Sequence, residues 1–142
     1  MPFDHERLDV YQRALEVLDL CDAIIEQMPT GRAHLKDQLD RAATSIVLNI
    51  AEGAGEFSRR EKRRFYRIAR RSATEAAAIL HIVQRRRHAD EQRVHQARDL
   101  LVRVVAMLVR MTKTHQPDRA RARARAREQA AEERLRRFSA AC

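Results

Sequence analysis

Residues 94–111 of the chain read VHQARDLLVRVVAMLVRM, and six apolar positions in this run are separated alternately by three and four residues. This spacing predicts a helix with one continuous apolar seam, the pattern found in helices that pack in left-handed bundles. A β-strand would instead alternate its apolar residues by two. The seam comprises Val94, Ala97, Leu101, Val104, Leu108 and Met111.

Three further amphipathic segments precede this helix, at residues 8–28, 33–52 and 59–87. Apolar residues recur in each with the 3.6-residue period of an α-helix. We expect each segment to bury one stripe in a shared core. The expected core positions are Tyr11, Ala14, Leu18, Cys21, Ile25 and Met28; Leu35, Leu39, Ala42, Ile46 and Ile50; and Phe65, Ile68, Ala69, Ser72, Ala76, Ile79, Leu80 and Val83.

Turn and cap residues mark the ends of these helices. The Pro-Thr-Gly sequence at residues 29–31 interrupts the first helix, because proline cannot continue the hydrogen-bond ladder. Gly53 and Gly55 stand where a left-handed C-terminal cap is expected for the second helix. Ser58 and Glu61 have the spacing of a capping box at the start of the third helix.

Short connections make consecutive helices run antiparallel. The sequence therefore predicts an all-α fold, an antiparallel up-down-up-down left-handed four-helix bundle over residues 1–116, followed by a basic C-terminal tail over residues 117–142. A chain of 142 residues suits one domain of this kind. Three Gly and three Pro are too few for the many turns of a β-sandwich.

The first helix is more apolar than one core requires, since about thirteen of its 21 positions are apolar. Two interpretations stay open. Some of these side chains are exposed, as apolar atoms are on any protein surface. Alternatively, a second face of this helix is buried against another subunit.

The tail differs in composition from the bundle, because arginine alternates with alanine from residue 119 to residue 127. Arginine then occupies every side of a helix and leaves no face to bury, so we expect a solvated tail that is helical at most in part. Its eight arginines and four acids contribute +4 to the net charge of +9. Two roles stay open for this segment: it binds phosphates, or it only increases the solubility of the protein. The alternating residues are Arg119, Arg121, Arg123, Arg125 and Arg127.

The composition disfavours several classes of protein. No Trp and only 4% aromatic residues leave little for the base-stacking platforms of RRM or OB domains. Two cysteines, Cys21 and Cys142, cannot build a disulfide framework or a zinc site. The longest apolar run, residues 104–109, is too short to span a membrane, and the first residues lack the apolar core of a signal peptide. We therefore expect a cytoplasmic protein without a membrane partner.

No catalytic residue, metal site or cofactor site is expected. A di-iron bundle would need two Glu-x-x-His motifs, and none of the six histidines belongs to one. The sequence also contains neither a phosphate-cradling glycine loop nor a hydrolase nucleophile elbow. We therefore expect that the protein is not an enzyme.

The third helix carries the densest positive charge of the chain. Four arginines at spacings of four, three and four lie on one side of a helix, over a length of about 16 Å. Their guanidinium groups suit phosphate oxygens, so this face could bind a polyanion. Two alternatives are that the face is only solvated, or that acids of the first helix neutralise it. The arginine ridge comprises Arg60, Arg64, Arg67 and Arg71, flanked by Arg63 and Arg70; the acids are Asp9, Glu16, Asp19 and Glu26.

Two polar residues, Asn49 and Glu52, lie close to the apolar stripe of the second helix. A buried polar group needs a partner, so we expect structural roles for both. Asn49 would bond across the core or cap a neighbouring loop, and Glu52 would satisfy loop N–H groups or pair with Arg41 or Arg70. A functional polar pocket is the alternative.

Five strings of the sequence resemble a known family. They are LDVYQRA at residues 8–14, QLDRAATSI at 38–46, NIAEG at 49–53, FYRIAR at 65–70 and SATE at 72–75. In these strings the chain resembles the small four-helix-bundle proteins of the S23 type, first noticed as reading frames in intervening sequences of bacterial 23S rRNA genes. The accessory variability determinant of diversity-generating retroelements is similar to this family.

The resemblance implies a left-handed antiparallel bundle that assembles into a homopentameric ring and has no catalytic residues. In the retroelement branch it implies a positively charged ring that binds nucleic acid and a reverse transcriptase. Membership in such a family determines architecture better than function.

Two functional hypotheses follow. The first is a non-enzymatic homopentamer that binds RNA or DNA through sequence-independent phosphate contacts, as an accessory to a polymerase or reverse transcriptase. The arginine ridge, helped by the tail arginines, would make these contacts. The second is a protein-interaction scaffold whose basic surface docks an acidic protein.

Overall fold

The computed structural model describes residues 2–113 and 119–141. Over these residues the protein is helical and has no β-strand, which confirms the all-α prediction. The chain divides into two units, Met1–Thr112 and Lys113–Cys142. The boundary expected between residues 116 and 117 falls within residues 114–118, outside the described residues.

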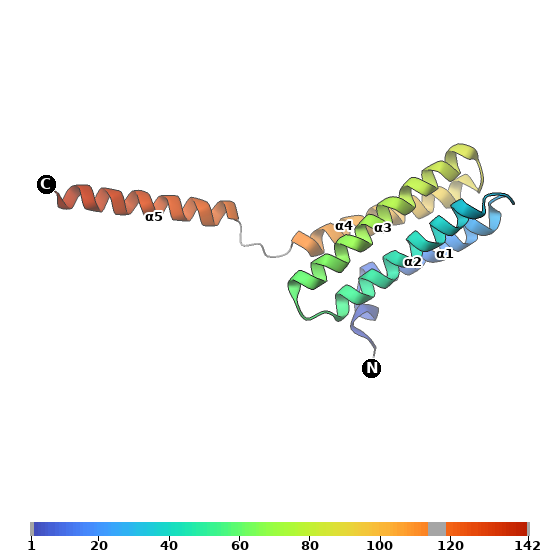
Figure 1. The fold of residues 1–142 in the computed structure, drawn as a ribbon, viewed down its shortest axis with the longest axis horizontal. Helices are drawn as coiled ribbons and strands as arrows, with labels where there is room; N and C mark the ends of the chain where they lie inside the picture. Colours follow the sequence, from blue (N-terminus) through green and yellow to red (C-terminus); the bar gives the residue numbers. More distant parts are fainter. Residues whose placement is uncertain (1, 114–118, 142) are drawn as a thin grey trace. The chain divides into compact units, whose positions relative to one another are not determined.

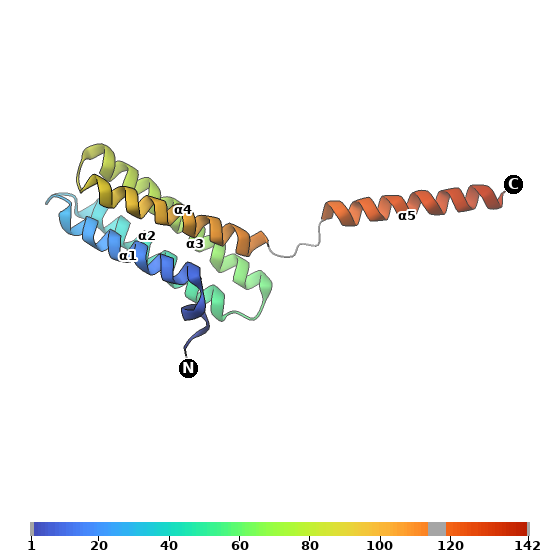
Figure 2. The same cartoon turned by 180° about the vertical axis from the view of Figure 1, so that it is seen from behind.

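The first unit is a bundle of four long helices. Consecutive helices run in opposite directions and are joined by short turns (Figures 1 and 2). Residues from all four helices share one apolar core. The elements are a short 3-10 helix, η1 (Asp4–Arg7), followed by α1 (Asp9–Gln27), α2 (Ala33–Gly55), α3 (Arg59–Arg86) and α4 (Glu91–Lys113).

The apolar seam of α4 is buried as predicted. Its residues from Val94 to Leu108 are at most 1% exposed, while Met111 at the end of the seam is half-buried. These side chains face the other three helices in one core cluster. The alternating spacing of three and four residues was therefore sufficient to identify the buried face of this helix.

The buried face of α1 differs from the predicted stripe. Tyr11, Leu18 and Ile25 are only half-buried, because the helix is turned by about one residue from the expected orientation. Apolar residues occupy both neighbouring positions, so periodicity alone could not choose between them. The buried residues are Val10, Ala14, Val17, Cys21, Ile24 and Met28.

The additional apolar side chains of α1 lie along the edges of this core. Leu15, Leu18, Leu20 and Ile25 are partly buried and pack against it. No large apolar side chain of α1, all of which the structure describes, is fully exposed. The additional apolar residues of α1 thus border the protein's own core within one chain.

The predicted glycine cap of α2 is wrong. Gly53 and Gly55 both lie within the helix, and the chain becomes extended at Glu56 (φ −81°, ψ 141°). Gly53 is needed for a different reason, because the ring of Tyr66 on α3 packs directly against it. Tyr66 is 5% exposed and occupies the core position for which Phe65 was predicted; Phe65 itself is half-buried.

The α1–α2 and α3–α4 turns lie at the end of the bundle away from the α2–α3 turn. Left-handed backbone conformations and one side-chain hydrogen bond stabilise them. Gly31, with φ of 95°, adopts the left-handed conformation between α1 and α2. Arg87, which caps the C-terminus of α3, also has the left-handed backbone conformation, with φ of 55°. Gln27 Oε1 accepts a hydrogen bond from the Asp90 N–H at 3.0 Å, which connects the end of α1 to the turn before α4.

From residue 119 to residue 140 the second unit is one helix, α5 (Arg119–Ala140), which corrects the expectation of a tail that is helical at most in part. Arginine, alanine and glutamate are strong helix formers, and Glu133 pairs with Arg137 at 2.7 Å across one turn. The side chains described in this unit, from residue 122 onward, are exposed, in agreement with a solvated segment. None of the described helices is both long and apolar enough to cross a membrane.

Candidate functional site

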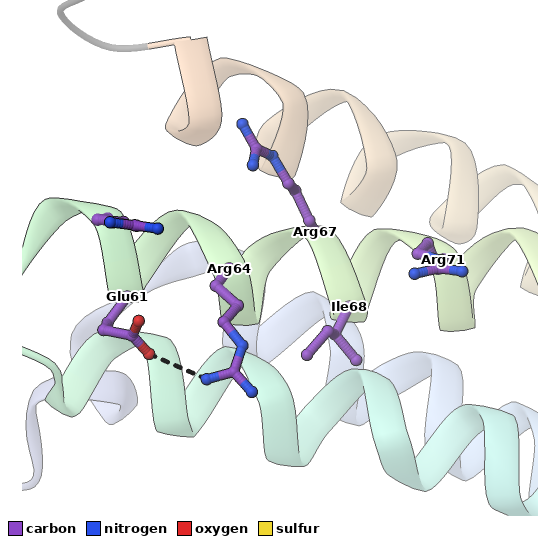
Figure 3. Close-up of a pocket in the computed structure, with 6 residues that line it drawn as sticks. Glu61, Arg64, Arg67, Ile68 and Arg71 are labelled. Carbon is purple, nitrogen blue, oxygen red and sulfur yellow. Dashed lines mark hydrogen bonds and ion pairs between the residues drawn. The ribbon is translucent and has the colours of Figure 1, made fainter.

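The arginine ridge lies on the N-terminal half of α3, and all four of its side chains are exposed. With Glu61 and Ile68 they line an open hollow of about 530 Å³. Figure 3 shows that the side chains of Arg64 and Arg67 leave α3 in opposite directions. The ridge therefore presents guanidinium groups on both flanks of the helix rather than in one line.

One ridge arginine has an acidic partner. Arg64 Nη1 lies 3.1 Å from Glu61 Oε2, and its guanidinium carbon lies 5.6 Å from the centre of the Phe65 ring. Among the described residues, Arg60, Arg67 and Arg71 form no ion pair. Three of the four ridge charges are therefore available to a ligand.

The acids of α1 do not neutralise the ridge within one chain. Arg13 of the same helix binds Asp9 at 3.3 Å and Glu16 at 2.7 Å, and these bonds raise the pKa of Arg13, the bond to Asp9 most of all. Asp19 and Glu26 form no ion pair with any described residue. Helix α1 contacts α2 and η1 but not α3, so its carboxylates lie away from the ridge.

Other acids gather on the face formed by α1 and α2. Asp22, Glu26, Asp37 and Asp40 line a hollow there together with Lys36. Burial, followed by repulsion from Asp40, raises the pKa of Asp22. No group of three or more His, Cys, Asp or Glu in the described part of the chain is arranged to hold a metal ion.

The flanking basic residues are less available than the ridge. Arg63 and Arg70 are half-buried. Lys62 points its ammonium group at the end of α2, where Nζ donates to the carbonyl oxygens of Gly53 at 3.2 Å and Ala54 at 3.0 Å. Lys62 therefore holds the α2–α3 turn, a role that sequence reasoning missed because the residue is one of many basic side chains in this segment.

The start of α3 confirms half of the predicted capping box. Ser58 Oγ accepts a hydrogen bond from the Glu61 N–H at 3.4 Å. The Glu61 carboxylate does not return to the Ser58 N–H; it binds Arg64 instead. The first turn of α3 is thus capped by one side chain, and Glu61 fixes the orientation of a ridge arginine.

Asn49 belongs to a polar chain between α2 and α3. Its Nδ2 donates to the backbone oxygen of Ser45 at 2.8 Å and to Ser45 Oγ at 3.0 Å, and Ser45 Oγ lies 2.8 Å from Ser72 Oγ. Asn49 therefore reaches the other helix through Ser45 rather than directly. This arrangement agrees with a structural role for Asn49.

The expected partners of Glu52 are not found. Its side chain is exposed and has no ion pair with a described residue. Arg41 pairs with Asp37 at 3.1 Å on its own helix, and Arg70 is not bonded to Glu52. The prediction of a structural pairing for Glu52 is wrong, because on α2 its position turns away from the core rather than toward it.

The tail arginines lie on α5, in the second unit. Arg123, Arg125 and Arg127 are exposed, and none of them forms an ion pair with a described residue. The side chains of Arg119 and Arg121 lie outside the described residues.

Comparison with known proteins defines the family. A family model described as 23S rRNA-intervening sequence protein matches residues 6–110. The chain belongs to this family. The match to these intervening-sequence proteins begins within η1 and covers nearly all of the four bundle helices, and α5 lies beyond it.

A solved structure has the same fold as this intervening-sequence protein. It is a protein of unknown function from the S23 ribosomal protein family of Bacteroides thetaiotaomicron VPI-5482, with 20% sequence identity and a TM-score of 0.69. The similarity covers 74% of this chain and 99% of the other. No curated protein matches the chain. At this level of identity the likeness establishes the fold alone.

Proposed function

We propose that this intervening-sequence protein binds nucleic acid through its phosphates, without base selectivity and without catalysis. The observation that carries the proposal is the arginine ridge, in which Arg60, Arg67 and Arg71 are exposed and have no acidic partner among the described residues. A guanidinium group donates two parallel hydrogen bonds to phosphate oxygens. Each phosphate neutralised in this way releases counterions and favours binding at low salt.

The exposed arginines of α5 would add to this affinity. Arg123, Arg125 and Arg127 follow one another at every second position, and no acid interrupts this run. A second basic segment on the same chain increases avidity when both segments bind one polyanion. The role of α5 is therefore auxiliary in this proposal.

We further propose a homopentameric ring that serves a polymerase or reverse transcriptase as an accessory. The proposal comes from the resemblance to the S23-type bundles and the retroelement determinant, which implies such a ring. Five copies of the ridge would multiply the positive field and the avidity for a long polyanion. Light scattering of the purified protein measures the mass directly, and a monomeric mass would overturn the ring.

The salt dependence of binding tests the phosphate contacts. We expect binding to generic RNA or duplex DNA at about 50 mM salt, with a log–log decrease as salt increases. Replacing Arg60, Arg67 and Arg71 together by Ala should reduce the magnitude of the salt slope by about one per arginine that contacts a phosphate. The matched control replaces three exposed arginines of α4, Arg93, Arg103 and Arg110, by Ala.

Two results would contradict this function. The first is absence of binding at low salt, and the second is an equal loss of slope in both triple variants. The absorbance of the purified protein offers an independent check, because two Tyr and no Trp make bound nucleic acid conspicuous in the 260/280 ratio. A clean ratio together with a co-purifying acidic protein would favour the scaffold hypothesis instead.

A further inference from the structure

Phe57 projects into solvent from the turn between α2 and α3. Its side chain is 101% exposed, more than any other large apolar side chain of the described residues. Burial of a Phe side chain ordinarily stabilises a fold, and this ring contributes nothing of that kind. It also has no ring contact with any described residue. The chain thus presents an aromatic ring that its own fold does not use.

The turn that carries Phe57 is fixed by side-chain bonds. Lys62 Nζ donates to the carbonyl oxygens of Gly53 and Ala54, which are the last turn of α2. The ring of Tyr66 packs on Gly53 from the other helix. The exposed ring is therefore attached to an ordered backbone. An anchor that is already ordered loses less conformational freedom when a ligand binds.

Arginines follow the ring closely in the sequence. Arg59 and Arg60 begin α3 directly after the turn, and both are exposed. Of the neighbouring acids, Glu61 is bonded to Arg64, which leaves Glu56 as the nearest acid without an ion pair among the described residues. The charge next to Phe57 is therefore mainly positive.

This combination suits an unpaired base better than a protein partner. The core of a protein–protein interface is apolar and depleted in charge, whereas Phe57 is a single exposed apolar side chain followed by the exposed Arg59 and Arg60. Single-stranded nucleic acids offer bases that stack on aromatic rings, and their phosphates meet adjacent basic side chains. In an intact duplex the bases are already stacked on each other, so the ring would find no free base face.

We propose that Phe57 stacks on an unpaired base of a nucleic acid strand whose phosphates lie along the arginine ridge. The ligand class is single-stranded RNA or DNA, which share this chemistry. The inference rests on the proposed function, because the ridge must hold phosphates before the ring meets a base.

The chain contains no Trp, so Phe57→Trp introduces a single indole as a reporter. We expect its fluorescence to be quenched by oligouridylate or oligothymidylate of about 12 nucleotides, and to change little with a blunt duplex of the same length. The two oligonucleotides distinguish RNA from DNA. Quenching of the indole fluorescence would report directly that a base stacks at this site.

Affinity measurements on two other variants separate stacking from charge. Phe57→Ala and Phe57→Leu should each weaken single-strand binding about 10-fold and leave duplex binding unchanged. The salt slope should stay the same, because no charge is removed. Leu48→Ala is the matched control, since Leu48 is an exposed apolar side chain on α2 (58%). Because Phe57 is fully exposed, these variants should unfold at the wild-type temperature.

The outcomes distinguish this inference from the proposed function. If the strand binds with a ridge-dependent salt slope while the indole stays unquenched and Phe57→Ala binds normally, the stacking contact is refuted and the phosphate contacts stand. If no nucleic acid binds at low salt, both fail. An equal loss of affinity for single strand and duplex in Phe57→Leu would also refute stacking on an unpaired base.

Discussion

The ring of Tyr66 lies against the bare backbone of Gly53, so closely that a Cβ at this glycine would stand 2.6 Å from Tyr66 Cε1. Because Tyr66 is 5% exposed, the ring has little room to retreat. We expect Gly53→Ala to destabilise the protein by about 1–3 kcal/mol, as other overpacked cores do. Urea unfolding followed by circular dichroism measures the change.

Gly55 provides the matched control for this prediction. It lies two residues further along α2, and a Cβ there would meet nothing within 4 Å. Gly55→Ala should therefore be neutral or stabilise the protein by up to about 1 kcal/mol, because alanine restricts the unfolded chain. Equal destabilisation by both substitutions would show that helix-end geometry, and not the Tyr66 ring, determines the effect.

The Ser45–Ser72 hydrogen bond should couple α2 to α3. Ser72 is 9% exposed, so Ser45→Ala leaves its hydroxyl without this partner and should cost about 1–3 kcal/mol. The double variant with Ser72→Ala should cost less than the two single variants added together. A double-mutant cycle from chemical unfolding measures this coupling, and exact additivity would show that the bond contributes nothing.

Cys21 should be inert in the folded protein. It is 0% exposed, and burial raises the pKa of its thiol to about 12. The thiolate is the reactive form, so we expect labelling by a thiol reagent at neutral pH to be at least about 100-fold slower in native buffer than in guanidinium chloride. A Cys142→Ser background confines the signal to Cys21. Comparable rates in the two solvents would contradict the buried placement.

His88 should make stability depend on pH. Its Nε2 is a buried atom without a hydrogen-bond partner among the described residues, and burial, followed by Arg32 and Arg86, lowers its pKa in the folded state. The unfolded chain then binds a proton more readily, so stability that is present above about pH 6.5 is lost as the pH falls through the lower folded pKa.

Unfolding midpoints measured between pH 5 and 8 check this expectation. His88→Gln should reduce the decrease of stability toward acid pH. His81→Gln, a substitution at an exposed histidine of α3, serves as the control and should retain the wild-type profile. A profile that is the same for all three proteins would rule out His88 as its source.

Helical periodicity predicts the bundle because burial and the 3.6-residue repeat depend on the same side chains. The α4 seam from Val94 to Leu108 could be assigned directly, since its alternating spacing of three and four residues is unbroken. The orientation of α1 could not, because Val10 and Tyr11 are both apolar and only packing against the other helices decides between them. Gly53 was misassigned for a related reason, since a left-handed cap and a close ring contact both require the absence of a Cβ.

The sequence predicts which helix carries the candidate site, but it does not predict which of its arginines have an acidic partner. The spacing of Arg60, Arg64, Arg67 and Arg71 predicts one line along one side of a helix, whereas the side chains of Arg64 and Arg67 leave α3 in opposite directions (Figure 3). Partner choice depends on which carboxylates lie near in space, so the sequence could not show which ridge arginine pairs; in the described part of the chain it is Arg64. The exposure of Phe57 also depends on the geometry of a turn, and a phenylalanine between Glu56 and Ser58 has no sequence signature of exposure.

The position of Lys62 changes how mutagenesis of this region should be interpreted. Its ammonium group faces two peptide carbonyls of α2, so a charge-reversal scan that treats every cation of α3 alike would open the α2–α3 turn at this residue. The resulting loss of folded protein would be mistaken for a loss of ligand binding. Lys62 therefore belongs with the scaffold in any such scan, and only the arginines report on polyanion recognition.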